Sequence, residues 1–384
     1  MAVLSEEQTM IRDGAKSWVQ EKSPVTVFRK LRDSGNPDGF DRAAWKEMAE
    51  MGWAGILIPE EFGGTGLGYL TLGLVLEETG RTLTASPLVS TALTATTALL
   101  LGGNDAQKKK YLPQIAEGKL IATLAVDEGP HHAPEKIALK AEKSGSGYKL
   151  NGKKNFVLDG GVADLIIVAA RTSGKPGDKT GVTLFLVDGK ANGLSREKLK
   201  TVDSRGVANL TFANVEVGAD AILGSADQGD GLLETTLDRA RVGLAAEMLG
   251  HAMQSFDVTL DYLKTRVQFG QVIGTFQALQ HRAVDMLMNV EQSRSMAMLA
   301  TMMAGESDNS ERRRSISGAK VHIAKASRYV GEQAIQLHGG IAMTLEYKAG
   351  HYFRRLLAIQ TMFGDLDHHM DLLSDAGGLA PADD

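Results

Sequence analysis

The chain has 384 residues, 43% of them hydrophobic and 23% charged, with a formal net charge of −5. This length exceeds one ordinary hydrophobic core and the composition is globular, which argues for two or three packed parts and against disorder. The absence of cysteine excludes disulfides, thiolate metal sites and a thiol nucleophile. The negative charge argues against a general nucleic-acid surface. The absence of a run of about 18 uncharged apolar residues argues against a membrane-spanning helix.

The N-terminal part of the chain is predicted to be helical. Charged residues mix with apolar ones at three-to-four spacing over Glu6–Gln20 and again over Asp41–Met51, whose first residue would cap the helix. Two further helices are expected over Leu70–Thr82 and Ser90–Leu101. They are more apolar than the first two, so we expect them to be more deeply buried. The first residues lack the basic and apolar regions of an export signal, so we expect a cytoplasmic protein.

The central part of the chain changes to the period of two that is typical of strands. Turn clusters such as Ser144–Gly147 and Asn151–Gly152 separate the apolar runs, and no helical pattern intervenes. This arrangement predicts an antiparallel sandwich or barrel. The expected strands are Ile121–Val126, Ile137–Glu142, Asp164–Ala170, Val182–Val187 and Asn209–Val217.

Helical patterns return in the C-terminal part and are much longer. They cover roughly residues 232–265, 275–304, 310–337 and 345–373, and short glycine-containing segments join them. Four helices of this length with short connections predict a four-helix bundle.

Few motifs in the chain point to a specific chemistry. The glycine-rich run Phe62–Gly68 only loosely matches a dinucleotide fingerprint, and a turn between two helices is the simpler interpretation. Neither histidine pair, His131-His132 or His368-His369, has zinc-binding spacing, so we expect no metal site. No Gly-x-Ser-x-Gly motif supports catalysis by a serine nucleophile.

Two segments at helix ends carry residues suited to a nucleotide. Arg266, Phe269 and Gln277 follow one long helix and open the next; they form either an interhelical turn with a surface arginine or a site for phosphate and a planar ring. Gln336–Gly340 ends a later helix, where paired glycines either cap the helix or let a phosphate approach bare backbone.

Asp238 and Arg241 lie three residues apart on one helix face, where an ion pair within the helix is the first interpretation. Taken with these features, the α–β–α order resembles the acyl-CoA dehydrogenase family over essentially the whole chain. Five strings carry the resemblance, in family order and spacing: Gly55-Ile-Leu-Ile-Pro-Glu-Glu-Phe-Gly-Gly64, Asn151-Gly-Lys-Lys154, Arg266-x-x-Phe269-Gly270, Phe276-Gln277 and Gln336-x-x-Gly339-Gly340.

The resemblance implies an α+β fold with an N-terminal helical domain (1–118), a central β domain (119–225) and a C-terminal four-helix bundle (226–384). It implies a flavoprotein of fatty acid metabolism that uses FAD to convert an acyl-CoA thioester to the 2,3-enoyl-CoA. The implied partners are an acyl-CoA substrate, an electron-transferring flavoprotein as electron acceptor, and other subunits in a homotetramer or in a heterotetramer with a second dehydrogenase subunit.

The resemblance also assigns residues to this chemistry. Asp238 and Arg241 would lie along the channel for the CoA thioester. The residues that would contact FAD are Arg266, Phe269, Gln277, Gln336 and Gly340 from the bundle, and Leu124, Phe156 and Leu158 beside the isoalloxazine ring.

The proton-accepting carboxylate of the family is the main departure. The family's usual glutamate position corresponds to Phe363, and its second location corresponds to Ala240; neither side chain accepts a proton. Either another carboxylate serves, Glu247 or Asp365, or the chain is the non-catalytic member of a heteromeric dehydrogenase whose partner provides the base. A third possibility is that the same fold carries out a different flavin-dependent oxidation, or that the chain binds CoA esters without turnover.

Overall fold

A computed structural model describes residues 4–378. These residues divide into two compact units, each built from several segments of the chain. The strand-containing unit comprises Lys30–Gly68 and Ala85–Ala240. The helical unit comprises the residues up to Arg29, Tyr69–Thr84 and those from Arg241 onward.

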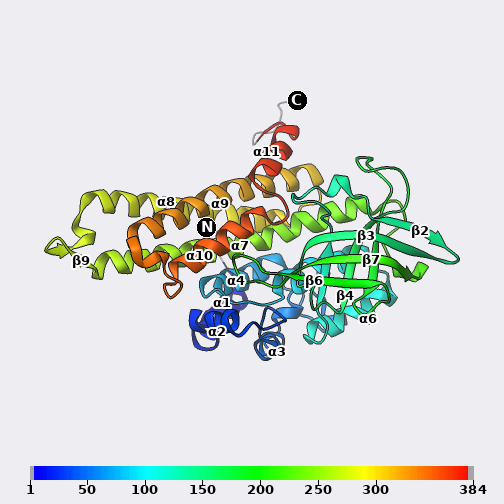
Figure 1. The fold of residues 1–384 in the computed structure, drawn as a ribbon, viewed down its shortest axis with the longest axis horizontal. Helices are drawn as coiled ribbons and strands as arrows, with labels where there is room; N and C mark the ends of the chain where they lie inside the picture. The colour runs from blue at the N-terminus through cyan, green and yellow to red at the C-terminus, as the bar shows by residue number, and fades with distance from the viewer. Residues whose placement is uncertain (1–3, 379–384) are drawn as a thin grey trace. The chain divides into compact units, whose positions relative to one another are not determined.

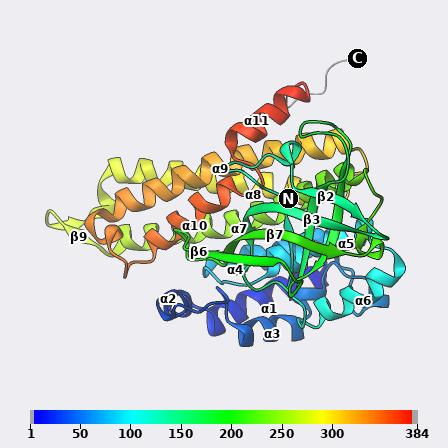
Figure 2. The ribbon, with the colours of Figure 1, turned by 45° about the vertical axis from the view of Figure 1, so that its right-hand side comes forward.

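An eight-stranded sheet organises the strand-containing unit, and its strands are ordered β6-β7-β3-β2-β4-β5-β8, with β1 beside β4. Figures 1 and 2 both show β6, β7 and β3 side by side, and these strands pair antiparallel. The strand path has two ends, so the barrel is not closed, and the sandwich is the form that fits. The strands are β1 (Ala122–Ala125), β2 (Lys140–Ser144), β3 (Gly147–Leu158), β4 (Leu165–Arg171), β5 (Val182–Asp188), β6 (Leu194–Leu199), β7 (Val207–Val217) and β8 (Ile222–Leu223).

The sheet differs from the sequence-based expectation in several details. The expected strands did not include β3, β6 or β8. The β1–β4 pairing and the single β2–β4 bridge are parallel rather than antiparallel. The predicted turn at Asn151–Gly152 is wrong, because both residues lie inside β3, where the register against β7 shifts between Leu150 and Gly152. Gly152 has a φ of 145°, and an added Cβ would lie 2.9 Å from Leu139 Cγ, so a glycine at a bulge imitates a turn signal.

The helical segments of the strand-containing unit follow local signals. Asp41 caps α3 (Arg42–Glu50) by accepting a hydrogen bond from the amide of Ala43 at 2.8 Å. The helix predicted over Ser90–Leu101 is divided into a buried π-helix, η3 (Leu88–Ala95), and α5 (Thr96–Gly102). Neither α6 (Asp105–Ala116) nor its capping asparagine was predicted.

The glycine-rich run near residue 64 is a turn between η2 (Glu60–Phe62) and α4 (Gly68–Arg81), as predicted. A Cβ on Gly64 would lie 2.0 Å from the carbonyl oxygen of Ile58. The glycine is therefore required by close backbone packing inside the turn.

Long helices make up the helical unit, and α9 lies against α8, α10 and α11. Small side chains fill one of its cores, which lets the helices approach closely. That core contains Val242, Ala300, Ala304, Ile316 and Ala319. The helices are α1 (Glu6–Lys22), α4, the later part of α7 (Gly229–Thr265), α8 (Gln277–Met303), α9 (Asn309–His338), α10 (Ala349–Thr361) and α11 (Leu366–Asp375), while α2 (Val25–Ser34) begins in this unit. Within residues 4–378, none of the helices has the length and apolar character needed to cross a bilayer.

The single helix predicted over residues 345–373 is interrupted in the structure. Phe363 and Gly364 have φ values of 53° and 108°, both left-handed, and they separate α10 from α11. Asp365 then caps α11 by accepting a hydrogen bond from the amide of His368 at 3.0 Å. The apolar periodicity continues across the break, which is why the sequence pattern did not reveal it.

Candidate functional site

The segment after α7 is a tight hairpin that exposes an aromatic ring. Strands β9 (Val267–Gln268) and β10 (Gln271–Val272) pair antiparallel, and the two residues between them, Phe269 and Gly270, have φ values of 54° and 78°. Positive φ at both central residues is typical of a two-residue hairpin turn that matches the strand twist. The Phe269 ring is 90% exposed and meets Phe276 edge-on, with 6.1 Å between centroids.

Arg266 stands at the base of this hairpin. Its amide donates to the Tyr262 carbonyl and its carbonyl accepts from the amide of Ile273, both at 2.9 Å, so the backbone is fixed while the guanidinium side chain is exposed. Gln277, the first residue of α8, is also exposed. A cation, an aromatic ring and an amide therefore project from one short segment.

The C-terminal end of α9 lies beside the C-terminal end of α7. His338 stacks between Tyr262 and Tyr347, with ring centroids 4.5 and 4.8 Å away. Gln336 and Gly340 flank this histidine and are exposed, and no atom lies within 4 Å of a Cβ built on Gly340. The structure thus brings the two sequence-predicted FAD segments, around Arg266 and around Gly340, to one end of the bundle.

The strand-containing unit holds the residues predicted to flank the flavin ring. Leu124 on β1 is buried, and the Thr123 hydroxyl beside it donates to the carbonyl of Leu158 at 2.6 Å, which ties β1 to the end of β3. Phe156 has a φ of 54° at the second register shift of β3, and its side chain is 55% exposed. Its amide donates to Asn209 Oδ1 at 3.2 Å, which helps to fix the backbone that carries the exposed ring.

The loop after β1 is tied to β3 by an ion pair between a buried lysine and a half-buried glutamate. Lys154 Nζ lies 2.6 Å from Glu128 Oε1 and 2.7 Å from the carbonyl oxygen of Val126. The Glu128 carboxylate also accepts hydrogen bonds from the amides of Ala138 and Leu139, both at 2.9 Å. Burial lowers the pKa of Lys154, and Glu128 opposes that shift. Sequence reasoning missed this network, because the polar neighbours of Lys154 gave no sign that its side chain is buried.

Another contact missed from the sequence joins η3 to the end of β3. The Ser90 hydroxyl donates to Asp159 Oδ2 at 2.5 Å, and the amide of Asp159, whose φ is 50°, donates to the carbonyl of Gly206 at 2.8 Å. The contact ties a buried π-helix to the strand end that carries Phe156 and Leu158.

Two residues of α7 were predicted to line a substrate channel, and both side chains are buried. Asp238 is fully covered. Arg241 Nε donates to the carbonyl of Phe363 at 2.8 Å, and its Nη2 lies 3.4 Å from Nε2 of His368. Arg241 therefore contacts the turn that carries Phe363.

The alternative carboxylates already have partners. Glu247 Oε1 accepts from Arg355 Nε and Nη2 at 3.0 and 2.8 Å, and His251 Nε2 lies 3.2 Å away, all buried. Asp365 caps α11. Glu247 is therefore held in a buried ion pair and Asp365 in a helix cap, and the Phe363 side chain cannot accept a proton.

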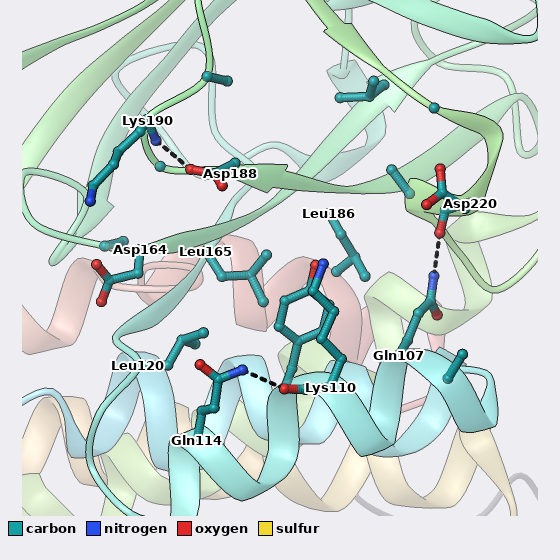
Figure 3. A pocket seen from close by; sticks show the side chains of 18 of the residues that line it. Gln107, Lys110, Gln114, Leu120, Asp164, Leu165, Leu186, Asp188, Lys190 and Asp220 are labelled. Atoms are coloured by element: carbon teal, nitrogen blue, oxygen red, sulfur yellow. Dashed lines mark hydrogen bonds between the residues drawn. The ribbon is translucent and has the colours of Figure 1, made fainter.

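A large cavity in the strand-containing unit lies elsewhere. It measures about 820 Å³ and separates α6 from the ends of β4 and β5. Figure 3 shows Leu120, Leu165 and Leu186 lining it, with Asp188 and Lys190 at one side. It contains none of the residues predicted for FAD or substrate, and its charges of both signs select no ligand class. Among residues 4–378, no group of three or more histidine, aspartate or glutamate side chains is arranged to hold a metal ion.

Comparison with known proteins establishes the family. Models of the acyl-CoA dehydrogenase N-terminal, middle and C-terminal domains match residues 5–119, 131–215 and 227–377. The chain belongs to the acyl-CoA dehydrogenase family. The mitochondrial isovaleryl-CoA dehydrogenase of Solanum tuberosum is 34% identical over 92% of this chain and 86% of that protein.

Solved structures agree with the fold of this acyl-CoA dehydrogenase family member. Butyryl-CoA dehydrogenase from Megasphaera elsdenii superposes with a TM-score of 0.90 at 25% identity, over 98% of this chain and 99% of that one. The FAD complex of PigA gives a TM-score of 0.89 at 25% identity, over 99% of both chains. The expected family fold, with helical N-terminal and C-terminal parts and a central sheet, is confirmed.

Proposed function

We propose that this acyl-CoA dehydrogenase homologue is a FAD-binding subunit that works with a second, unlike dehydrogenase subunit, which provides the catalytic base. The reaction of the family removes a proton from the carbon next to the thioester carbonyl and a hydride from the following carbon, giving the 2,3-enoyl-CoA. When bound, FAD supplies the hydride acceptor. A proton acceptor must come from protein.

The residues assigned to FAD fit that cofactor. Arg266 presents an exposed guanidinium on a fixed backbone, the Phe269 ring is exposed at the tip of the β9–β10 hairpin, and the backbone at Gly340 is open. A dinucleotide offers a pyrophosphate for the cation and the open backbone, and a planar base for the ring. Arg266, Phe269, Gln277, Gln336 and Gly340 would hold the adenosine and pyrophosphate, and Leu124, Phe156 and Leu158 would flank the ring system.

The observation that carries the proposal is that no proton acceptor stands where the resemblance assigns the base. The turn at residue 363 contacts Arg241, but its side chain is a phenyl ring. Glu247 is bonded to Arg355, and the side chain of Asp365 is used as a helix cap. Using Glu247 as a base would leave the Arg355 charge uncompensated in a buried site, which is costly. A base from a second subunit removes that difficulty.

The alternative is that this chain uses its own base, Glu247 or Asp365. It requires one of the two carboxylates to leave its present partner when substrate binds. Because that rearrangement costs a buried ion pair or a helix cap, we place it second. The readings as a different flavin-dependent oxidation, or as a CoA-ester-binding module without turnover, have no feature of the structure in their favour.

Further details of the function are proposed from the family resemblance. Asp238 and Arg241 would line the channel for the CoA thioester, an electron-transferring flavoprotein would accept the electrons, and the assembly would be a tetramer in the cytoplasm. The division at residues 118/119 and 225/226 is likewise proposed as the domain organisation.

The decisive experiment compares the isolated chain with the assembly from its native source. Purification through this chain, followed by mass spectrometry and flavin counting, should recover a second acyl-CoA dehydrogenase homologue in equal amount. A panel of acyl-CoA thioesters should bleach the oxidised flavin of the assembly and not that of the isolated chain loaded with FAD. Full bleaching by the isolated chain, abolished by Glu247→Gln or Asp365→Asn, would establish the own-base alternative instead.

A further inference from the structure

The turn between α10 and α11 is built around one buried ammonium group. Lys320 on α9 is 1% exposed, and its Nζ lies within hydrogen-bond distance of four backbone carbonyl oxygens. These belong to Ile359 at 3.3 Å, Gln360 at 3.1 Å, Met362 at 3.0 Å and Gly364 at 3.1 Å. We call these four carbonyls the carbonyl cage. An ammonium has three donors and a neutral amine has two, so the arrangement is that of the charged form.

The Lys320 ammonium compensates the carbonyl dipoles that this turn brings together. The carbonyls of Ile359 and Gln360 belong to the last turn of α10, where the regular hydrogen bonds of the helix end and the carbonyls carry the negative end of its dipole. The Ile359 carbonyl also accepts a hydrogen bond from the amide of Met362, at 3.0 Å. Phe363 and Gly364 then bend the chain through left-handed φ values, which points further carbonyls inward. Without a cation these clustered carbonyl dipoles would repel one another in a buried site.

A second cation holds one of the carbonyls that the cage leaves out. Arg241 Nε donates to the Phe363 carbonyl at 2.8 Å. Four of the five carbonyls from Gln360 to Gly364 therefore meet a positive charge from α7 or α9. The backbone conformation of residue 363 is thus set by side chains that are distant in the sequence.

We propose that Lys320 is a positioning residue: its ammonium acts as a built-in cation that gathers the carbonyl cage and, with Arg241, fixes the backbone that carries residue 363. The cage is formed by atoms of this chain, and its role in fixing the turn does not depend on the proposed function.

The test removes the cation and then returns it. Lys320→Ala deletes the atoms of a propylammonium ion, so n-propylammonium chloride can refill the site. Amide hydrogen exchange over residues 361–369 reports the turn, because the amides of Met362, His368 and His369 are hydrogen-bonded within it. The protein is studied as purified, in its assembly and below neutral pH, without substrate.

The expected result is exchange about tenfold faster or more in the turn of the Lys320→Ala protein, with no such change in α8. Propylammonium should slow this exchange toward the wild-type rate, and sodium chloride of equal ionic strength, or propanol, should not. Lys325→Ala is the matched control, since Lys325 lies on the same helix and is exposed; it should leave the turn unchanged.

Unchanged exchange in the turn of Lys320→Ala would overturn the proposal, and so would exchange that propanol slows as much as propylammonium does. If Lys320→Ala does not fold, Lys320→Met decides the question, because it keeps most of the volume and loses only the charge. A Lys320→Met protein with wild-type exchange over residues 361–369 would contradict the role of the charge. Failure of the wild-type assembly to reduce its flavin would remove the proposed function and leave this exchange experiment intact.

Discussion

Arg355 on α10 holds Glu247 on α7 by two hydrogen bonds to one carboxylate oxygen, Nε–Oε1 at 3.0 Å and Nη2–Oε1 at 2.8 Å. Both side chains are buried, and His251 lies against the same oxygen at 3.2 Å. The pair links two helices of the unit that also carries the Phe363 turn. It explains why a charged residue interrupts the apolar Ala-Ala-Glu run of α7: its partner is an arginine more than a hundred residues away.

We predict that this pair stabilises the helical unit and takes no part in catalysis. Glu247→Gln should lower the free energy of unfolding by about 3–5 kcal/mol, because it leaves the Arg355 guanidinium uncompensated in a buried site. The double variant Glu247→Met with Arg355→Leu should recover most of this loss. Urea denaturation of wild type, Glu247→Gln and the double variant measures both changes.

The same variants test the alternative role. If Glu247→Gln keeps wild-type stability and bound FAD while substrate no longer bleaches the flavin, then Glu247 is the base. Glu234 provides a control on the same helix: it is exposed, and Glu234→Gln should leave stability within about 0.5 kcal/mol of wild type.

A second prediction concerns residue 363 itself. Phe363→Glu places a carboxylate at the position to which the family resemblance assigns the base, on a turn that Arg241 and Lys320 contact. The isolated chain, loaded with FAD, should then gain acyl-CoA-dependent flavin bleaching by about 10²-fold or more, the usual contribution of a positioned general base. Stopped-flow absorbance of the oxidised flavin measures it.

Phe363→Gln controls for size and polarity without adding a proton acceptor. Equal rates for the Glu and Gln proteins, both with full flavin, would mean that the turn does not present residue 363 to the thioester.

The sequence predicted the parts of this fold that depend on local patterns. The periodicity of two located β1, β4, β5 and β7, and the long apolar repeats located α7, α8 and α9. Strand β3 was missed because Asn151-Gly152 has the composition of a turn. A sequence alone does not distinguish a glycine at a β-bulge from a glycine in a turn. The sequence-based prediction also ran one helix through Phe363, because left-handed φ at a phenylalanine leaves no compositional trace and depends on cations supplied by α7 and α9.

The candidate site divides in the same way. Motif residues such as Arg266 and Gly340 could be placed from the resemblance, and the structure brings their segments to one end of the bundle. The contacts that decide between roles could not be predicted. Glu247 pairs with Arg355 and Lys320 with the carbonyl cage across long stretches of chain, and a single sequence carries no record of such pairings.

The nucleotide residues give a third prediction. Arg266→Met should weaken FAD binding by about 10- to 100-fold, the range expected when a charge-assisted hydrogen bond to phosphate is lost. Phe269→Ala should weaken it less, since it removes an exposed stacking surface. Titration of the apo assembly with FAD, followed by flavin fluorescence, measures both dissociation constants.

Lys264→Met is the control for Arg266, because Lys264 is an exposed cation two residues earlier on α7. An equal loss of affinity in both variants would assign the effect to general surface charge rather than to a defined contact of Arg266.

The last prediction is a pH dependence at Lys320. Burial, and then the charge of Arg241, lower the pKa of Lys320 from 10.5 to about 7, while Asp365 raises it. Beside them, His368 lies near Arg241 and His369 lies against Gly364. Above neutral pH the folded protein loses the Lys320 proton, and the neutral amine can no longer serve all four carbonyls.

Two opposite trends should follow as the pH rises. Because the folded pKa lies below the unfolded one, unfolding takes up a proton between about pH 7 and pH 10.5, so through this group the free energy of unfolding increases with pH across that window and is constant below it. Over the same window the turn should loosen, and exchange over residues 361–369, corrected for intrinsic rates, should accelerate. Lys320→Met keeps His368, His369, Asp365 and Arg241, so it should show neither trend. Denaturation and exchange of both proteins at about pH 6 and about pH 9 check this, and equal pH profiles for the two proteins would show that the histidines or Asp365, and not Lys320, control the turn.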